Sequence, residues 1–248
     1  MTPALEANNP GMEDIVRAIL TGTAPAPDVA PTVTVLRLGL ATMSDLRPLA
    51  GLSALQTLVL TRTRVADLSP LAGLAALREL DLKLTRIADL AALAGLTRLR
   101  SLILSFTAVT DIRPLRGLTG LESCYLTGTL VSDISPVAGL TALERLDLGG
   151  TPVADIGPLS GLTRLRSLEL AGTRVVDLTP LAGLRELAFL DIGDTPVTDL
   201  RPLSGLTRLR RIDVRGTKAA DLSALAGMSD CEIVTALTVP RRRRASAP

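Results

Sequence analysis

Residues 55–74 read LQTLVLTRTRVADLSPLAGL, and the same pattern returns every 22 residues along most of this 248-residue chain. The aspartate of this stretch, Asp67, recurs at positions 45, 89, 111, 133, 155, 177, 199 and 221. Thr63 recurs at positions 85, 107, 129, 151, 173, 195 and 217, and Gly73 recurs at the same interval. A spacing kept without insertion or deletion indicates tandem units that stack on one another.

Each unit contains one short strand. Leu58 and Leu60 alternate with Val59, which is typical of a strand with one buried face. The other fixed leucine and valine positions converge with Leu58 and Leu60 on one interior. A single unit is too small to bury that face, so neighbouring units must cover one another. The sequence therefore predicts a solenoid to which every unit adds one strand.

The pattern Leu55-x-x-Leu58-x-Leu60-x-x-Thr63 resembles the leucine-rich repeat, with threonine where asparagine or cysteine is usual. The 22-residue length is similar to the repeats of the bacterial internalins, and the resemblance covers residues 33 to 239. It implies an α/β repeat solenoid, a curved horseshoe with a parallel β-sheet on its concave side and short 3-10 or irregular turns on its convex side. The sequence departs from internalins in its threonine ladder and in showing no secretion signal, cell-wall anchor or immunoglobulin-like domain.

The two ends of the chain differ from the repeats. Residues 12–21 have helical periodicity through Ile15, Ala18 and Ile19, and we expect a short helix that caps the first repeat. Residues 23–32 form a proline-rich connector. We therefore divide the chain into residues 1–32 (tail, capping helix and linker), 33–239 (about nine to ten repeats) and 240–248 (a disordered basic tail).

The composition excludes several classes of activity. The chain has no histidine, which excludes Ser-His-Asp and Cys-His catalysis and histidine metal sites. No phosphate-binding loop, zinc-ligand cluster or dinucleotide fingerprint occurs, so no cofactor and no metal are expected. Paired carboxylates leave a hydrolase as an alternative, but nothing indicates a deep pocket that excludes water. We interpret the chain as non-enzymatic.

Two cysteines, Cys124 and Cys231, occupy interior leucine positions about five strands apart, on the order of 24 Å at the spacing of strands in a sheet. That separation is too great for a disulfide, so we expect both thiols to be buried, reduced and inert. The sequence shows no signal peptide and no membrane-spanning run. It predicts a cytoplasmic protein without membrane contact, and secretion by another route stays an alternative.

The aspartate and threonine ladders have a structural and a functional interpretation. Each aspartate precedes a short Leu-x-Pro segment, as in Asp67-Leu68-Ser69-Pro70, and is expected to accept backbone N–H groups at the start of a helical turn. The alternative is a calcium ladder, which normally accompanies glycine-rich nonapeptides that are missing here. Thr63 and its equivalents are expected to satisfy backbone groups in the bend after each strand.

The candidate binding residues lie on the outward strand positions, which would form the concave face. We call the middle one of these positions the central row. It is apolar in its N-terminal half and carries four consecutive carboxylates in its C-terminal half. All three aromatic residues of the chain fall on this face. The central row is predicted to comprise Arg37, Val59, Asp81, Ile103, Tyr125, Asp147, Glu169, Asp191, Asp213 and Thr235, with Phe106 at its rim and Phe189 beside it.

Two hypotheses fit the four carboxylates. Like charges on adjacent strands lie about 4.8 Å apart, which is unfavourable without compensation. Arginines nearby can screen them and leave a merely solvated face: Arg145, Arg166, Arg210, Arg211 and Arg215. Alternatively, the carboxylates are free to bind a basic partner.

Small residues gather where the strands end, and here too two hypotheses remain. They either serve the bend after each strand or open a shallow channel beside the carboxylates. The residues are Gly128, Gly149, Gly150, Ala171, Gly172, Gly193 and Gly216.

The basic tail, Arg241–Arg244, has four interpretations. It is a stretch of solvated charges, a nucleic-acid contact, part of a kinase site with Ser246, or a segment that folds back onto the four carboxylates of the central row.

Together these patterns predict a module that binds a protein or peptide on its concave face. The apolar and aromatic side chains would anchor the partner, and the carboxylates would attract it. The matching surface of the partner should be basic beside an apolar patch. The alternatives are a secreted or translocated effector that binds a host protein, and contact with nucleic acid or another anionic surface through Arg241, Arg242, Arg243 and Arg244.

Overall fold

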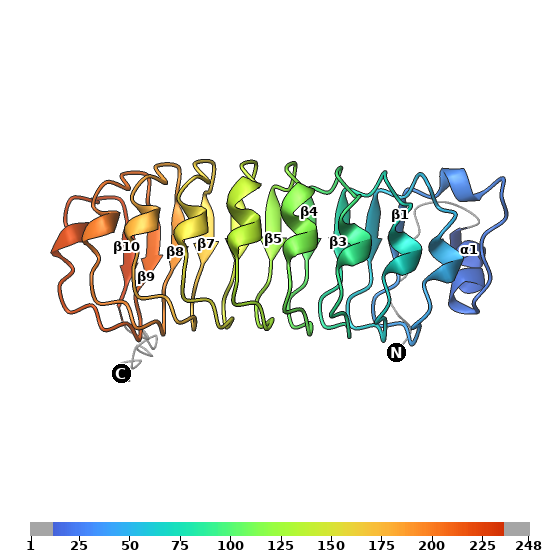
Figure 1. Cartoon of the computed structure of the whole chain (residues 1–248), viewed down its shortest axis with the longest axis horizontal. Coiled ribbons are helices and arrows are strands. Elements are labelled where there is room, and N and C mark those ends of the chain that lie inside the picture. The colour runs from blue at the N-terminus through green and yellow to red at the C-terminus, as the bar shows by residue number, and fades with distance from the viewer. Residues whose placement is uncertain (1–11, 236–248) are drawn as a thin grey trace, which may run out of the picture.

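The computed structural model describes residues 12–235, and within that range ten strands form one curved sheet in chain order (Figure 1). Every neighbouring pair is parallel. Each strand has three residues. They are β1 (Val35–Arg37), β2 (Thr57–Val59), β3 (Glu79–Asp81), β4 (Ser101–Ile103), β5 (Ser123–Tyr125), β6 (Arg145–Asp147), β7 (Ser167–Glu169), β8 (Phe189–Asp191), β9 (Arg211–Asp213) and β10 (Glu232–Val234).

A 3-10 helix lies between each strand and the next, and Figure 1 shows these helices as a layer on one side of the sheet. The predicted leucine-rich-repeat solenoid, with strands on one side and short turns on the other, is therefore confirmed. The helices are Arg47–Leu49, Ser69–Leu71, Ala91–Leu93, Arg113–Gly117, Ser135–Gly139, Gly157–Leu159, Thr179–Leu181, Arg201–Leu203 and Ser223–Leu225.

The predicted capping helix is confirmed as α1 (Met12–Leu20), which lies at the N-terminal end of the solenoid (Figure 1). Its acidic residues lie in the first turn and Arg17 lies in the last, which suits the helix dipole. Val16 and Ile19 are buried in the same core as the leucines of the first repeats. The connector after α1 is not wholly irregular, because it ends in a 3-10 helix at Ala30–Thr32.

At the other end of the described chain, the core thins. Leu222, Met228 and Ile233 of the last repeat are only partly buried, whereas their counterparts in earlier repeats are fully buried. The last strand of the sheet is Glu232–Val234. Residues 236–239 of the predicted repeat domain and the predicted basic tail lie outside the described residues.

The aspartate ladder has the structural role that the sequence indicates. In all nine cases an aspartate Oδ1 accepts the backbone N–H two residues later, at 2.7–2.9 Å, where the 3-10 helix begins. In seven of the nine cases the pKa of the aspartate is lowered by such bonds: Asp45, Asp67, Asp111, Asp133, Asp177, Asp199 and Asp221. The pKa of Asp67, for example, is lowered by the backbone N–H and then by the hydroxyl of Ser69.

The threonine ladder satisfies backbone carbonyls in the buried bend. In all eight cases, from Thr63 to Thr217, the hydroxyl donates to the carbonyl oxygen three residues earlier, at 2.6–2.8 Å. Among the described residues no buried side-chain nitrogen or oxygen lacks a hydrogen-bond partner. Threonine thus replaces asparagine in this ladder without leaving a buried polar side-chain atom that lacks a hydrogen-bond partner.

The threonine ladder can be tested at Thr129, which is 1% exposed and donates to the Leu126 carbonyl at 2.7 Å. Thr129→Val keeps the shape and removes the hydroxyl. We expect it to lower the free energy of unfolding by about 1 kcal/mol, because the carbonyl still accepts the Thr129 N–H. Denaturant titration measures this loss. Thr129→Ser, which keeps the hydroxyl, is the control, and an equal loss in both variants would assign the cost to packing.

Candidate protein-interaction surface

The strand register places the central row as predicted over nine strands. Arg37, Val59 and Asp81 are successive partners, and the pairing continues without a slip through to Asp213 of β9. Because the strands are in register, side chains of this row lie on neighbouring strands of one face. The sequence-predicted residues of the row are therefore brought together by the fold.

The prediction that Thr235 completes the central row is wrong. In β10 it is Val234 that pairs with Asp213, and Ile233 pairs with the buried Ile212. The last repeat contains one residue fewer than 22 before its strand. A shift of one residue exchanges the two faces of a strand, so the register adopted is the one that packs Ile233 against the core.

The N-terminal half of the row presents apolar side chains. Val59, Ile103 and Tyr125 are partly exposed, and Phe106 is 50% exposed at the rim. The Phe106 ring lies against Gly128, where any side chain would collide with it. Lys83 Nζ lies 5.9 Å from the centre of the same ring, within reach of a cation–π contact. This half therefore offers an aromatic anchor that is already held in place.

Asp81 lies in the apolar half, and two local hydrogen bonds fix the position of its carboxylate. Its Oδ2 accepts the Thr61 hydroxyl and its Oδ1 accepts the Lys83 N–H, both at 2.8 Å. Asp81 thus contributes a fixed acceptor between apolar neighbours.

The bend after each strand requires a left-handed backbone. Gly128, Gly150, Gly172 and Gly216 have φ between +64° and +68°, a region in which glycine carries no steric penalty. In the first four repeats the same position is occupied by non-glycine residues with φ between +58° and +65°: Leu40, Arg62, Leu84 and Phe106. Such residues are strained there by on the order of 1 kcal/mol or more.

The small residues at the strand ends also border a hollow of about 390 Å³. Ala171, Gly193 and Gly216 line it together with Asp191 and Arg215. The two hypotheses for these residues are thus both correct in part. Four of the glycines avoid strain at the left-handed bend, and the lack of side chains also leaves space beside Asp191.

Three carboxylates of the C-terminal half remain without a cationic partner in the described residues. Asp147 accepts the Thr127 hydroxyl and the Gly149 N–H, and Asp191 accepts the Gly193 N–H at 2.8 Å. Partial burial raises the pKa of Glu169, and the neighbouring Asp147 and Asp191 raise it further. Burial likewise raises the pKa of Asp191 more than the Gly193 bond lowers it. Holding the charged carboxylates of Glu169 and Asp191 on this face therefore lowers the stability of the fold.

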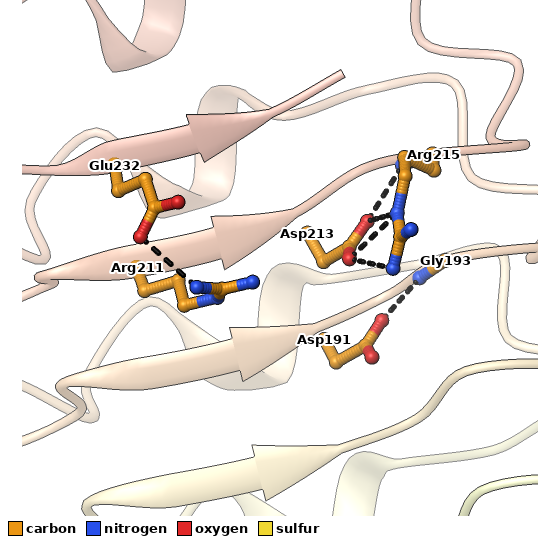
Figure 2. A network of polar contacts seen from close by, with 6 residues as sticks. All are labelled: Asp191, Gly193, Arg211, Asp213, Arg215 and Glu232. Carbon is orange, nitrogen blue, oxygen red and sulfur yellow. Dashed lines mark hydrogen bonds and ion pairs between the residues drawn. The ribbon is translucent and has the colours of Figure 1, made fainter. Parts of the chain in front are cut away.

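Asp213 differs from the other three carboxylates and is not available as a free charge. Only 4% of it is exposed, and both of its oxygens lie 2.8 Å from Nε of Arg215 (Figure 2). Burial alone raises the pKa of Asp213, but the hydrogen bonds and charge of Arg215 outweigh it and hold the pKa below its usual range. A partner at this position would meet Arg215, so the expectation of four exposed carboxylates is corrected to three.

Screening by arginine is local. Arg215 pairs with Asp213, and Arg211 pairs with Glu232 at 3.0 Å (Figure 2). Arg145 donates to the Ser123 hydroxyl. Within residues 12–235, Arg166 and Arg210 form no ion pair. The solvated-face hypothesis therefore accounts for Asp213 and not for the other carboxylates.

The two cysteines behave differently from each other. Cys124 is fully buried behind the central row, and burial raises the pKa of its thiol to about 12. Cys231, in the last repeat of the described chain, is only partly buried. The expectation that both are buried is therefore wrong for Cys231, while the expectation that they are unpaired is confirmed.

The comparisons with known proteins agree with this geometry. A family model described as leucine-rich repeats (two copies) matches residues 141–183. The crystal structure of internalin C2 from Listeria monocytogenes superimposes with a TM-score of 0.76 at 30% identity, covering 82% of this chain and 92% of that one. The chain belongs to the internalin-type leucine-rich-repeat proteins.

Two further structures show how widely the fold is shared. A second internalin of Listeria monocytogenes has 25% identity and a TM-score of 0.61, covering 92% of this chain and 82% of that one. The ectodomain of a membrane receptor kinase from Arabidopsis thaliana, solved in complex with Casparian strip integrity factor 2, has 16% identity and a TM-score of 0.70. It covers 77% of this chain and 25% of that one. No curated protein matches the sequence.

Neither a metal centre nor a membrane span is found in residues 12–235. No group of three or more histidine, cysteine, aspartate or glutamate side chains is placed to hold a metal ion in this range. No helix in the same range has the length and apolar character needed to cross a membrane. Internalin-type leucine-rich repeats are generally protein-interaction scaffolds rather than enzymes.

The strain at the left-handed bend can be measured with two glycines that both leave room for a methyl group. Gly150 has φ +65°, and a methyl group there would make only ordinary contacts, the nearest at 3.8 Å. Gly161 has neither a left-handed backbone nor a neighbour within 4 Å of such a group. We expect Gly150→Ala to lower the free energy of unfolding by about 1 kcal/mol, and Gly161→Ala to raise it slightly. Equal effects in denaturant titrations would contradict a strained bend.

Because Glu169 and Asp191 repel each other, neutral substitutions at these two positions should raise the thermal midpoint of unfolding, and the increase should depend on pH. Glu169→Gln with Asp191→Asn should raise the thermal midpoint at about pH 7, where both carboxylates are charged in the fold. Their folded pKa values are raised, so this gain should fade as the pH drops through those values. It should vanish near about pH 3, where the same two groups of the wild type are neutral as well.

A control is Glu186→Gln, because Glu186 pairs with the guanidinium of Arg208 and its equivalents in the two neighbouring repeats, Arg164 and Arg208, are arginines. Its neutralisation should give no gain at neutral pH. If both variants raised the midpoint equally, the effect would reflect net charge and not the crowding of the row.

Proposed function

We propose that this chain binds a protein or peptide on its concave face. The observation that carries the proposal is the polarity of the central row. Exposed apolar and aromatic side chains, centred on Tyr125 and Phe106, lie on one half. On the other half lie three carboxylates that the described residues do not neutralise: Asp147, Glu169 and Asp191.

The first half of this surface suits an apolar anchor. Aromatic side chains at the centre of an interface contribute a large share of its binding energy. Leu84 and Phe106 are displayed from left-handed backbone positions that glycine fills in later repeats, except at Asp194. Strain of this kind is frequent at functional sites, where a side chain is retained for what it contacts.

The second half suits a basic group. Carboxylates that are partly buried and crowded gain when a cation binds, because it removes their mutual repulsion. A lysine or arginine of the partner would lie over Asp147, Glu169 and Asp191, while its apolar residues contact Tyr125 and Phe106. The Arabidopsis ectodomain, which shares only the fold, was solved with a partner bound.

The proposal can be tested by selection from a library of random-sequence peptides on the full chain. We expect enrichment of peptides that combine apolar residues with lysine or arginine. The combined variant Tyr125→Ala, Asp147→Lys and Asp191→Lys should bind the selected peptides at least about tenfold more weakly, and binding to the wild type should weaken with salt.

The control variant places the same added charge on the convex side. Ala72, Ala94, Ala138 and Ala182 are exposed there, and changing all four to lysine matches the net charge of the concave variant. Binding should be retained. Equal loss in both variants would show attraction by net charge alone, and absence of any enriched peptide would contradict concave-face peptide binding. The cytoplasmic location stays a prediction from the sequence.

A further inference from the structure

A second hollow, of about 600 Å³, lies outside the central row at the edge of the sheet where the strands begin. We call this the start edge. Its floor includes Ala188, the residue immediately before β8, and its sides include Arg166 and Arg210, the corresponding residues before β7 and β9. A short side chain between two long ones makes the hollow. Phe189, which is 49% exposed, borders it.

The charges around this hollow do not cancel. Arg208 pairs with Glu186, and Asp230 contributes one further carboxylate to the lining. Arg166 and Arg210 also line it and form no ion pair within residues 12–235. The guanidinium groups of Arg166 and Arg210, one on each side of Ala188, can therefore donate hydrogen bonds to an anion. Arginine is well suited to this role because its planar fork matches the two oxygens of a carboxylate.

Phe189 also borders a neighbouring hollow of about 370 Å³, which is lined by Glu169 and Asp191. The arginines on the lining of that hollow, Arg211 and Arg215, are already paired with Glu232 and Asp213. Glu169 follows Arg166 by three residues along β7, a rise of about 10 Å in a strand. An exposed aromatic ring thus separates a basic hollow from an acidic one.

We propose that the hollow between Arg166 and Arg210 is a carboxylate subsite for the bound peptide. An acidic side chain of the ligand would occupy it, an apolar side chain would cover Phe189, and a basic side chain would lie on Glu169 and Asp191. The inference rests on the proposed function, since it assumes that the ligand is a peptide on the concave face. It adds the order of three ligand groups along the strand direction.

The acidic hollow argues against a nucleic acid as the occupant. A strand of phosphates that ran from Arg166 and Arg210 toward the central row would place further negative charge beside Glu169 and Asp191, and like charges repel. A peptide with opposite charges on either side of an apolar residue satisfies both hollows. Charge complementarity therefore selects a peptide of mixed charge.

The test compares peptide selection on the full-length wild type with selection on Arg166→Glu/Arg210→Glu. We expect wild-type peptides to contain an acidic, an apolar and a basic residue in close succession, and the variant to exchange the acidic residue for a basic one. Wild-type peptides should bind the variant about tenfold more weakly. Arg78→Glu/Arg98→Glu is the matched control at the same edge near β3 and β4 and should leave binding unchanged.

A second variant fills the hollow without removing either arginine. Ala188→Glu places a carboxylate of the chain itself between Arg166 and Arg210. We expect it to weaken peptide binding as strongly as the double reversal while keeping or raising the thermal midpoint, which shows that the fold is intact. Asp230→Asn, which removes the carboxylate that competes for the arginines, should tighten binding.

The outcomes separate this inference from the proposed function. Enriched peptides that are apolar and basic but lack an acidic residue would overturn the carboxylate subsite and leave concave-face binding standing. Absence of any enriched peptide would overturn both. Binding of a single-stranded oligonucleotide that is lost in Arg166→Glu/Arg210→Glu but kept in Arg78→Glu/Arg98→Glu would replace the peptide with a nucleic acid and overturn the subsite.

Discussion

Each strand of this solenoid is only three residues long, so no repeat can bury its own leucines, and every repeat depends on the register of its neighbours. The 22-residue period keeps Leu58, Leu80 and Leu102 in one interior stack, and the strands add to one another in parallel. Stability is then a sum of interfaces between nearest neighbours. Ends are the weak points of such an arrangement. The helix α1 covers the first repeat, while the last described repeat leaves Cys231 and Ile233 partly exposed.

The same constraint decides where function can reside. The interior positions, the threonine hydroxyls of the bend and the aspartate carboxylates of the 3-10 turns are all committed to the scaffold. What varies between repeats is mainly the outward side of the strands and the residues at their two edges. On that surface the chain changes from apolar to acidic, with Phe189 between hollows of opposite charge. The chain tolerates crowded carboxylates and left-handed leucines there, features that the scaffold itself does not require.

Much of the fold could be predicted because its rules are local and repeat. The hydroxyl of Thr63 reaches the carbonyl of Leu60, and Asp67 reaches the N–H of Ser69, within a few residues in the chain. The register that placed Val59 beside Asp81 follows from the period alone. The failure at Thr235 has the opposite origin, because the period changes in the last repeat and no aspartate or threonine marks the change.

The site was less predictable because it depends on side-chain geometry. The sequence placed Arg215 near Asp213 but did not indicate that the Asp213 carboxylate would be buried beneath it, which requires the neighbouring strands. The hollow at Ala188 lies where a short side chain interrupts a row of long residues; the 22-residue period aligns Arg166, Ala188 and Arg210, but not the position of the guanidinium groups that border the hollow. Left-handed Leu84 and Phe106 could have been inferred from the glycines at equivalent positions in later repeats.

The central claim is that a peptide ligand lies along the concave face and contacts both halves of the central row. Backbone amide chemical shifts of the full chain, followed by NMR as a selected peptide is added, test it most directly. The account predicts that perturbed amides cluster from β4 to β9 on the outward strand positions, including Tyr125, Phe189 and Asp191. Perturbations confined to the 3-10 turns, such as Ser69–Leu71 and Thr179–Leu181, would place the ligand on the convex side and contradict it.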